Sequence, residues 1–295
     1  MNIAVCIKPV PDVSILTLDP GTGLINGDDL AYIVNPYDMV ALEEAVRIKE
    51  RDGKSKITLI SMAPPSSKEL LHQCLAIGAD EAILLWDSSF ENSDSYATGV
   101  ILAKAIGAGQ YDLVLCGQKA VDTEAGQVGS VIAEKLEIPS VSRVVQIDIS
   151  PDATKADVES KLEKGNRARI EVSLPALLAV ELDLNEPRYA SLPSLMAGLR
   201  KDIPEYNREA LGLSYNEVGS EGSRIATGLL SLPKPRPKKI FTPDSNLSAE
   251  ERLRLVISGG VTQKQSDVLE GDPGKIAATV VQFLSEKEFL QSAGG

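Results

Sequence analysis

Residues 116–133, Cys-Gly-Gln-Lys-Ala-Val-Asp-Thr-Glu-Ala-Gly-Gln-Val-Gly-Ser-Val-Ile-Ala, have the composition and order of a phosphate-binding segment. The apolar run 111–116 predicts a buried strand. Gly126, Gly129 and Ser130 lie where a loop passes into an apolar helical pattern. Free N–H groups and the helix dipole favour an anion at such a helix start, and small residues let a phosphate approach the backbone. The alternative is a strand-to-helix connection without a ligand, because such turns are common.

Other reactive side chains are sparse. The chain contains one histidine, His72, which argues against histidine-based metal sites and catalytic triads. Cys6, Cys74 and Cys116 are far apart in apolar segments, so we interpret them as small buried side chains in a reducing cytoplasm. Ser-Gly-Gly at 258–260 is followed by Val-Thr and is interpreted as a turn. The pattern favours a protein that holds a nucleotide over a self-contained catalyst.

Charge and hydropathy exclude two classes of partner. The 295 residues carry a formal net charge of −12, which argues against nucleic acid because no dense basic surface is available. No apolar run approaches the length of a membrane span, and the first residues predict a strand instead of a signal peptide. We therefore expect a cytoplasmic protein with no direct membrane insertion.

Alternating strand and helix patterns must position the phosphate-binding segment. Strands are predicted at 2–7, 56–62, 81–86 and 111–116, and helices at 35–52, 66–77 and 95–106. Asn35 is the expected N-cap of the first helix, Pro36 its first residue and Gly53 its C-cap. The first strand is followed by a stiff, extended segment, Lys-Pro-Val-Pro-Asp at 8–12, and a surface loop is expected at 19–27.

This order predicts an α/β fold with a doubly wound, mostly parallel, Rossmann-like sheet. Ligands of such sheets bind outside the carboxyl ends of the strands. Residues 6–8, Met62 and residues 116–118 should converge there, together with the helix starts at Asn35 and Gly126.

The pattern changes after residue 140. Segments 142–149, 155–162 and 167–172 alternate polar and apolar residues like antiparallel strands, and 176–182 is a continuous apolar strand. We expect these strands within 140–184 to extend or flank the same sheet. A short helix near Leu195, helical signals over 205–223, a polyproline-type linker at 232–239 and helices at 248–257 and 274–290 follow. The expected division is a nucleotide-binding α/β domain, 1–200, and a linker with a partner-contacting C-terminal arm, 201–295.

Several stretches together resemble the beta subunit of electron transfer flavoproteins, in order and in spacing over the first 200 residues. They are Val-Cys-Ile-Lys-Pro-Val-Pro-Asp at 5–12, Asn-Pro-Tyr-Asp at 35–38 with 41–46, Ala-Ile-Gly-Ala-Asp at 76–80, the stretch 116–129, and Leu-Asn-Glu-Pro-Arg-Tyr-Ala at 184–190. The resemblance implies a heterodimer with an alpha subunit that carries FAD. It also implies a second adenine nucleotide in the beta subunit.

Family members differ in that second nucleotide, which is a structural AMP or, in electron-bifurcating relatives, a second FAD reduced by NADH. Lys8 with the following Pro-Val-Pro-Asp, Val128 in place of a threonine, and the long C-terminal segment with 257–260 and 269–273 resemble the bifurcating branch. Pro9 replaces the glutamine of that branch, and residues 123–126 depart from both usual patterns. We therefore expect electrons from NADH to part between ferredoxin or flavodoxin and the alpha-subunit FAD, with NADH oxidised only by the heterodimer.

Two alternatives remain open: an AMP-binding electron carrier between acyl-CoA-type dehydrogenases and a quinone reductase, and an adenine-nucleotide sensor of related fold. The resemblance implies nucleotide contacts from Cys6, Lys8, Asn35, Pro36, Tyr37, Asp38, Met62, Asp122, Thr123, Glu124, Ala125, Gly126, Gln127, Val128, Gly129, Ser130, Val131, Ile132 and Ala133. From the residues alone, Met62 is a core residue and Lys8 a solvated lysine. Leu192 matches a leucine that docks on partner dehydrogenases, but the lysine cluster that should follow is replaced by Ala-Gly-Leu-Arg-Lys-Asp at 197–202. A packed loop leucine is the alternative for Leu192.

Overall fold

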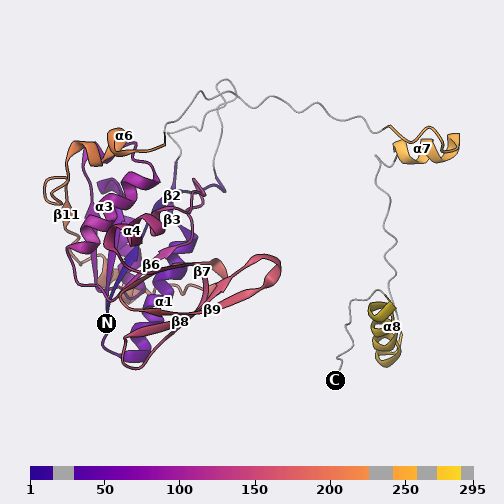
Figure 1. Ribbon diagram of the computed structural model, residues 1–295, viewed down its shortest axis with the longest axis horizontal. Helices are drawn as coiled ribbons and strands as arrows, with labels where there is room; N and C mark the ends of the chain where they lie inside the picture. Colours follow the sequence, from indigo (N-terminus) through magenta and orange to yellow (C-terminus); the bar gives the residue numbers. More distant parts are fainter. Residues whose placement is uncertain (16–29, 226–241, 258–270, 287–295) are drawn as a thin grey trace. The chain divides into compact units, whose positions relative to one another are not determined.

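The computed structural model describes residues 1–15, 30–225, 242–257 and 271–286 (Figure 1). The chain divides into two compact units, Met1–Leu230 and Ser231–Gly295, which are described separately. The loop expected at 19–27, the linker at 232–239 and the turn at 258–260 lie outside the described residues.

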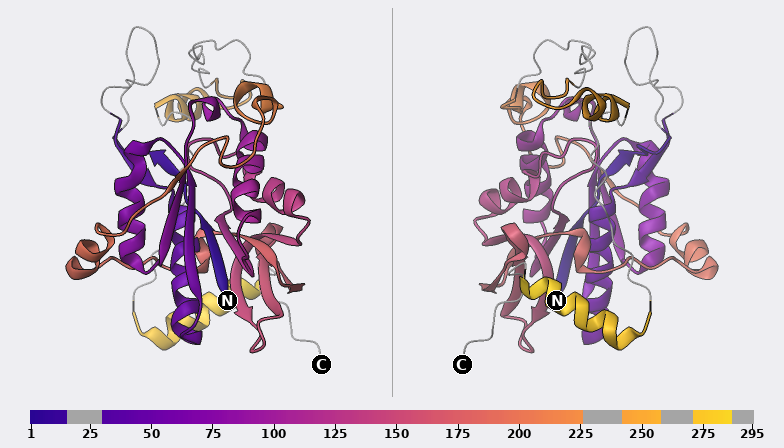
Figure 2. Two further views of the ribbon diagram at one scale, coloured as in Figure 1. Left: turned by 90° about the vertical axis from the view of Figure 1, so that its left-hand side faces the viewer. Right: turned by 90° about the vertical axis from the view of Figure 1, so that its right-hand side faces the viewer.

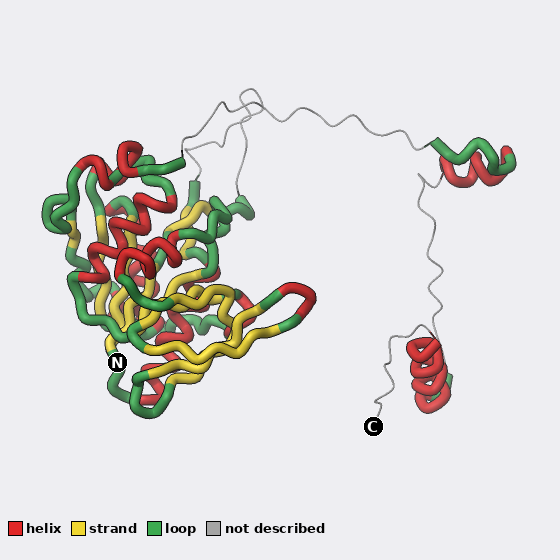
Figure 3. Tube along the Cα trace, in the orientation of Figure 1, coloured by secondary structure: helices red, strands yellow, loops and turns green. Residues whose placement is uncertain are grey.

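The first unit contains the α/β sheet that the sequence predicts. Within the described residues, nine strands form one sheet in the order β11-β5-β4-β1-β6-β10-β7-β8-β9. Figure 3 draws the strands in yellow. The central strands are β1 (Asn2–Cys6), β4 (Lys56–Met62), β5 (Glu81–Leu85), β6 (Leu113–Gly117) and β10 (Ala176–Val180). They pair in parallel, with β1 between β4 and β6. The predicted fold class is confirmed.

Helices cover both faces of this sheet (Figure 2). They are α1 (Pro36–Asp52), α2 (Lys68–Ile77), α3 (Ser95–Gly107) and α4 (Val128–Leu136). Alternation along β1 produces two cores, because Ile3 and Val5 pack in the cluster of α1 and α2 while Ala4 and Cys6 pack in that of α3 and α4. A strand that is buried on both faces reads as a continuous apolar run, as β1 and β6 do.

Antiparallel strands extend the sheet on one side, as expected. β7 (Ser140–Ile149), β8 (Lys155–Lys161) and β9 (Arg167–Ser173) are joined in sequence. The chain then returns as β10, which inserts in parallel between β6 and β7. The carboxyl end of β10 therefore joins those of β1 and β6 at one edge.

Two segments differ from the expectations. Residues 9–11 form a strand, β2 (Pro9–Pro11), which pairs antiparallel with β3 (Tyr32–Val34). Residues 203–223 contain the two-residue strand β11 (Glu205–Tyr206) beside β5 and the single helical turn α6 (Gly219–Gly222), so the helical prediction for 205–223 is wrong over most of its length. The buried side chains of Ile203, Leu211, Leu213 and Val218 hold this segment to the first unit, because they belong to the two cores.

The remaining helices lie close to the positions predicted from the sequence. α5 (Leu192–Gly198) packs on α2, where His72 Nδ1 lies 3.0 Å from the carbonyl oxygen of Gly198. The second unit contains α7 (Ala249–Ile257) and α8 (Pro273–Glu286), which expose large apolar side chains. These are Leu253, Val256, Ile257, Val280, Val281 and Phe283. Among the described residues, no helix has the length and apolarity required to span a membrane.

Candidate functional site

A cavity of about 400 Å³ opens where β1, β4 and β6 end and α4 begins. Its volume falls in the usual range of small-molecule sites, roughly 300–1,000 Å³. It is lined by Cys6, Ile7, Lys8, Asn35, Asp38, Met62, Ser93, Asp94, Ser95, Thr98, Leu102, Cys116, Gly117, Gln118, Lys119, Ala120, Thr123, Ala125, Gly126, Gln127, Val128, Gly129 and Ile225. The predicted convergence of strand ends and helix starts is present in the structure.

Asn35 connects three segments of the cavity wall. Its backbone N–H donates to the carbonyl oxygen of Lys8 (2.9 Å), and its side-chain Nδ2 donates to that of Lys119 (3.0 Å). Its Oδ1 accepts from the backbone N–H of Val121 (3.3 Å). Although Asn35 occupies the N-cap position of α1, its side chain makes no capping hydrogen bond there. The amide instead ties the loop after β6 to the start of α1.

Asp38, in the first turn of α1, joins the ends of β1 and β6. Oδ2 accepts the backbone N–H of Lys8 (2.8 Å), and Oδ1 accepts that of Gly117 (3.0 Å). Burial raises the pKa of Asp38 to about 7, against the opposing effect of hydrogen bonds from Lys8, Asn35 and Gly117. A carboxyl group that titrates near neutrality thus forms part of the cavity wall.

Two cationic side chains line the cavity, and each is paired with a carboxylate of the loop before α4. Lys8 Nζ lies 2.7 Å from Asp122 Oδ2, and Lys119 Nζ lies 2.9 Å from Glu124 Oε1. The Lys8 side chain is 42% exposed, so its pair contributes little stability. Both ammonium groups are therefore available to an anion in the cavity at small cost.

The loop before α4 turns sharply into the cavity. Glu124 (φ 51°) and Gly126 (φ 61°) adopt left-handed conformations, which direct residues 125–129 to the cavity wall. α4 then lies close to the sheet, because a Cβ on Gly129 would approach Cys116 Sγ to 2.9 Å. The helix start, with its free N–H groups, is thereby held against the end of β6.

The thiols near the cavity are not reactive nucleophiles. Burial raises the pKa of Cys6 to about 12, and burial with the nearby Cys6 raises that of Cys116 well above its ordinary value. All three cysteines are free and buried, as the sequence predicts. Among the described residues, no group of three or more His, Cys, Asp or Glu side chains is arranged to hold a metal ion.

The structure brings most of the expected site residues to the cavity but not all of them. Those that line it are Cys6, Lys8, Asn35, Asp38, Met62, Thr123, Ala125, Gly126, Gln127, Val128 and Gly129. Those outside its lining are Pro36, Tyr37, Asp122, Glu124, Ser130, Val131, Ile132 and Ala133. Ile132 and Ala133 are buried on the face of α4 that packs on the sheet, as their helical spacing requires.

Sequence reasoning missed one wall, which the start of α3 and Ile225 provide. Asp94 caps α3 by accepting from the N–H of Ala97 (2.8 Å), and its other oxygen accepts the N–H groups of Arg224 (2.7 Å) and Ile225 (2.9 Å). Asn-Ser-Asp-Ser at 92–95, ahead of a helical pattern, is a recognisable capping signal. No local signal connects it with Ile225.

Leu192 is not part of this cavity lining; it begins α5, and 71% of it is exposed. The packed-leucine alternative is therefore wrong. Tyr189, at 99% exposure, precedes it, and Met196 and Leu199 are also exposed. These four residues form what we call the α5 patch.

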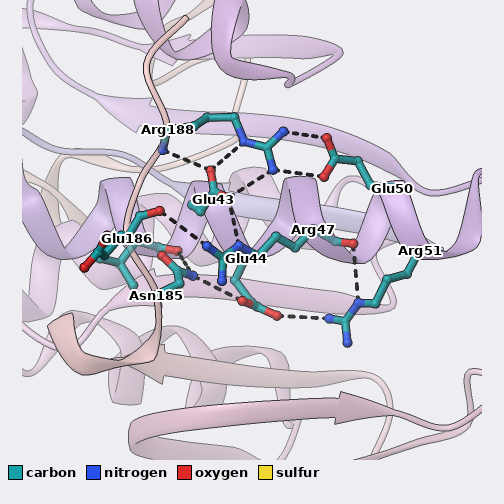
Figure 4. Close-up of polar contacts among 9 residues, drawn as sticks. Glu43, Glu44, Arg47, Glu50, Arg51, Asn185, Glu186 and Arg188 are labelled. Carbon is teal, nitrogen blue, oxygen red and sulfur yellow. Dashed lines mark hydrogen bonds and ion pairs between the residues drawn. The ribbon is translucent and has the colours of Figure 1, made fainter.

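Ion pairs fix the segment leading to the α5 patch on α1 (Figure 4). Arg188 Nε donates to Glu43 Oε2 (2.9 Å), and its Nη2 donates to Glu50 Oε2 (2.9 Å). Asn185 Nδ2 donates to Glu44 Oε2 (3.1 Å). Burial alone would raise the pKa of Glu43, but hydrogen bonds from Arg188 and Arg47 hold it below its ordinary value. We call this set of contacts the α1 clamp.

The amino-acid sequence is similar to those of one protein family. Residues 22–211 match the electron transfer flavoprotein domain. An electron transfer flavoprotein subunit beta of Thermoanaerobacterium thermosaccharolyticum is 43% identical over 82% of this chain and 92% of that protein. The caffeyl-CoA reductase-Etf complex subunit CarD of Acetobacterium woodii is 41% identical over 76% of this chain and 84% of that protein. Protein FixA of Azotobacter vinelandii is 34% identical over 86% of this chain and 92% of that protein.

Proposed function

The chain belongs to the electron transfer flavoprotein family as a beta subunit, and we propose that its strand-end cavity binds an adenine nucleotide. The observation that carries the proposal is the start of α4, which lines the cavity beside Lys8 and Lys119. Free N–H groups, a favourable helix dipole and two cations match a phosphate. The apolar lining from Met62, Leu102 and Val128 suits the flat rings of a nucleotide.

The proposed nucleotide is a second FAD. Its support comes from Lys8, which lines the cavity next to the rigid β2 strand, and from Val128, which lines the cavity as the first residue of α4. The similarity to CarD, named as part of a caffeyl-CoA reductase-Etf complex, is consistent with this branch. The flavin would supply the redox chemistry, taking electrons from NADH for a low-potential ferredoxin or flavodoxin and for the alpha-subunit FAD. This chain's residues would bind and orient it.

The proposed assembly is a heterodimer with an alpha subunit, located in the cytoplasm. The exposed apolar side chains of α7 and α8 support it, since such side chains on helices are normally covered by another surface. The proposed contact with an acyl-CoA-type dehydrogenase is the α5 patch, where Leu192 is presented on a segment fixed by the α1 clamp.

Flavin content tests the choice of nucleotide. We expect two flavins per purified heterodimer and bleaching of the flavin absorption on addition of NADH. The assay should be repeated after incubation with FAD, because a weakly held flavin is lost in purification. One flavin with one AMP, and no reaction with NADH after FAD incubation, would instead identify the AMP-binding electron carrier.

Opposite substitutions in one ion pair test the role of the cavity cations. Lys8→Met is expected to weaken AMP binding about tenfold or more, because it removes a cation and leaves Asp122 unneutralised. Asp122→Asn should strengthen binding, since Lys8 then loses its competing partner. Both side chains are partly exposed, so the unfolding midpoints should change little. Calorimetric titration with AMP measures both effects, and weaker binding by Asp122→Asn would show that Asp122 contacts the ligand itself.

A further inference from the structure

Gln118 lines the cavity but is not among the residues for which the family resemblance implies a nucleotide contact. It follows β6 directly, and its backbone N–H donates to the carbonyl oxygen of Val180 (2.8 Å) at the end of β10. Its position is therefore fixed by two neighbouring parallel strands. It lines the cavity, as do the apolar residues Leu102 and Met62.

An irregularity in β7 fixes the orientation of the Gln118 amide. Arg143 has a left-handed backbone (φ 55°), and the pairing of β7 with β10 shifts register between Val141 and Val144, on either side of it. The backbone N–H of Arg143 donates to Gln118 Oε1 at 2.7 Å. A backbone N–H can only donate, so the side-chain atom facing it must be the oxygen. The opposite atom, Nε2, is consequently the one that carries the two free donors.

This amide nitrogen lies beside the phosphate-binding loop. A Cβ built on Gly126 would lie 3.8 Å from Gln118 Nε2 and 3.3 Å from the carbonyl oxygen of Gln118. Among the described residues, Nε2 has no recorded hydrogen-bond acceptor. Lys119 and the start of α4 line the same cavity. The Gln118 amide nitrogen, the Lys119 ammonium group and the N–H groups at the start of α4 thus face the same cavity, and donors and a cation of this kind suit an anion.

We propose that Gln118 Nε2 donates a hydrogen bond to a phosphate oxygen of the bound nucleotide, held in that orientation by the Arg143 bulge. This inference rests on the proposed nucleotide function of the cavity. It assigns a ligand-binding role to Gln118 and a positioning role to the left-handed backbone of Arg143.

Gln118→Glu isolates the donor, because the substitution has the same shape. One carboxylate oxygen still accepts from Arg143, while the other replaces the NH₂ group with a negative charge toward the phosphate. We expect the affinity for AMP to fall at least about tenfold and that for adenosine, which lacks the phosphate, to stay within about twofold. The measurement is calorimetric titration of the nucleotide-depleted heterodimer, formed by the full chain and its alpha subunit, with AMP and with adenosine. Gln118→Met, which has neither donor nor charge, should lose AMP affinity by a smaller factor.

The outcomes distinguish a failure of the Gln118 contact from a failure of the proposed nucleotide binding. A wild-type protein that binds neither AMP nor FAD would overturn the nucleotide site itself. Wild-type binding that Gln118→Glu leaves unchanged would overturn the role of Gln118 alone. If a variant with a wild-type circular dichroism spectrum lost equal affinity for AMP and for adenosine, Gln118 would contact the base or ribose, contrary to the proposal. Gln118→Met repeats the comparison if the glutamate variant does not fold.

Discussion

Gly117→Ala is expected to destabilise the first unit by about 3 kcal/mol or more, because the new methyl group has no space. Its Cβ would lie 2.4 Å from Asp38 Oδ1 and 2.5 Å from Tyr37 Cβ, both in the first turn of α1. Either α1 must move away from β6 or Asp38 must give up its hydrogen bonds. Urea unfolding followed by circular dichroism measures the loss.

Gly53→Ala is the matched control. Gly53 ends α1 with φ 65°, and a Cβ there would meet no atom within 4 Å, so the cost is backbone strain alone, about 1 kcal/mol. Equal losses in the two variants would show that α1 and β6 do not make the close contact described.

Asp38 is expected to make stability fall as pH rises through the weakly acidic range. Its pKa is raised from 3.8 to about 7 in the folded protein, so the unfolded chain releases this proton at lower pH than the folded one does. The contribution of Asp38 to stability is therefore largest below about pH 4, decreases between pH 4 and 7, and is constant above 7. A shift of this size corresponds to about 4 kcal/mol in all.

Asp38→Asn isolates this titration, because asparagine has nearly the same shape and does not ionise. The variant places an NH₂ group against the N–H of Lys8 or Gly117, which costs a constant amount at every pH. The free energy of unfolding of the wild type, minus that of the variant, should fall between pH 4 and 7. Carboxyl groups with lowered pKa, such as Glu43 and Asp80, act in the opposite direction but cancel in this difference. A difference that is independent of pH would contradict the burial of an ionisable Asp38.

Local patterns were sufficient for most of the first unit. The apolar run of β6 and the Asn-Pro start of α1 were readable because buried strands and helix starts leave signals within a few residues. The doubly wound order then brought Met62 and residues 6–8 to one edge, and the structure confirms that convergence. Those parts of the site follow from chain order and strand direction.

What the sequence did not reveal depends on contacts between distant residues. The Asn35 amide was expected to cap its own helix but bonds Lys119, 84 residues away. Pro9–Pro11 pairs with Tyr32–Val34, a distant part of the chain, and prolines are poor strand signals. The orientation of Gln118 depends on a bulge at Arg143, on another strand. Side-chain partners of this kind are decided by tertiary packing, which local propensity does not encode.

The α1 clamp has a consequence for which sequence changes the chain tolerates. Asp38, at one end of α1, forms part of the cavity wall, and Glu43 and Glu50 further along bind Arg188, in the segment that leads to the α5 patch. One inserted residue between Asp38 and Glu43 would rotate everything beyond it by about 100° around the helix axis. The length of one helix thus sets the orientation of the strand-end cavity relative to the α5 patch. This stretch of α1 cannot gain or lose a residue without uncoupling the two surfaces.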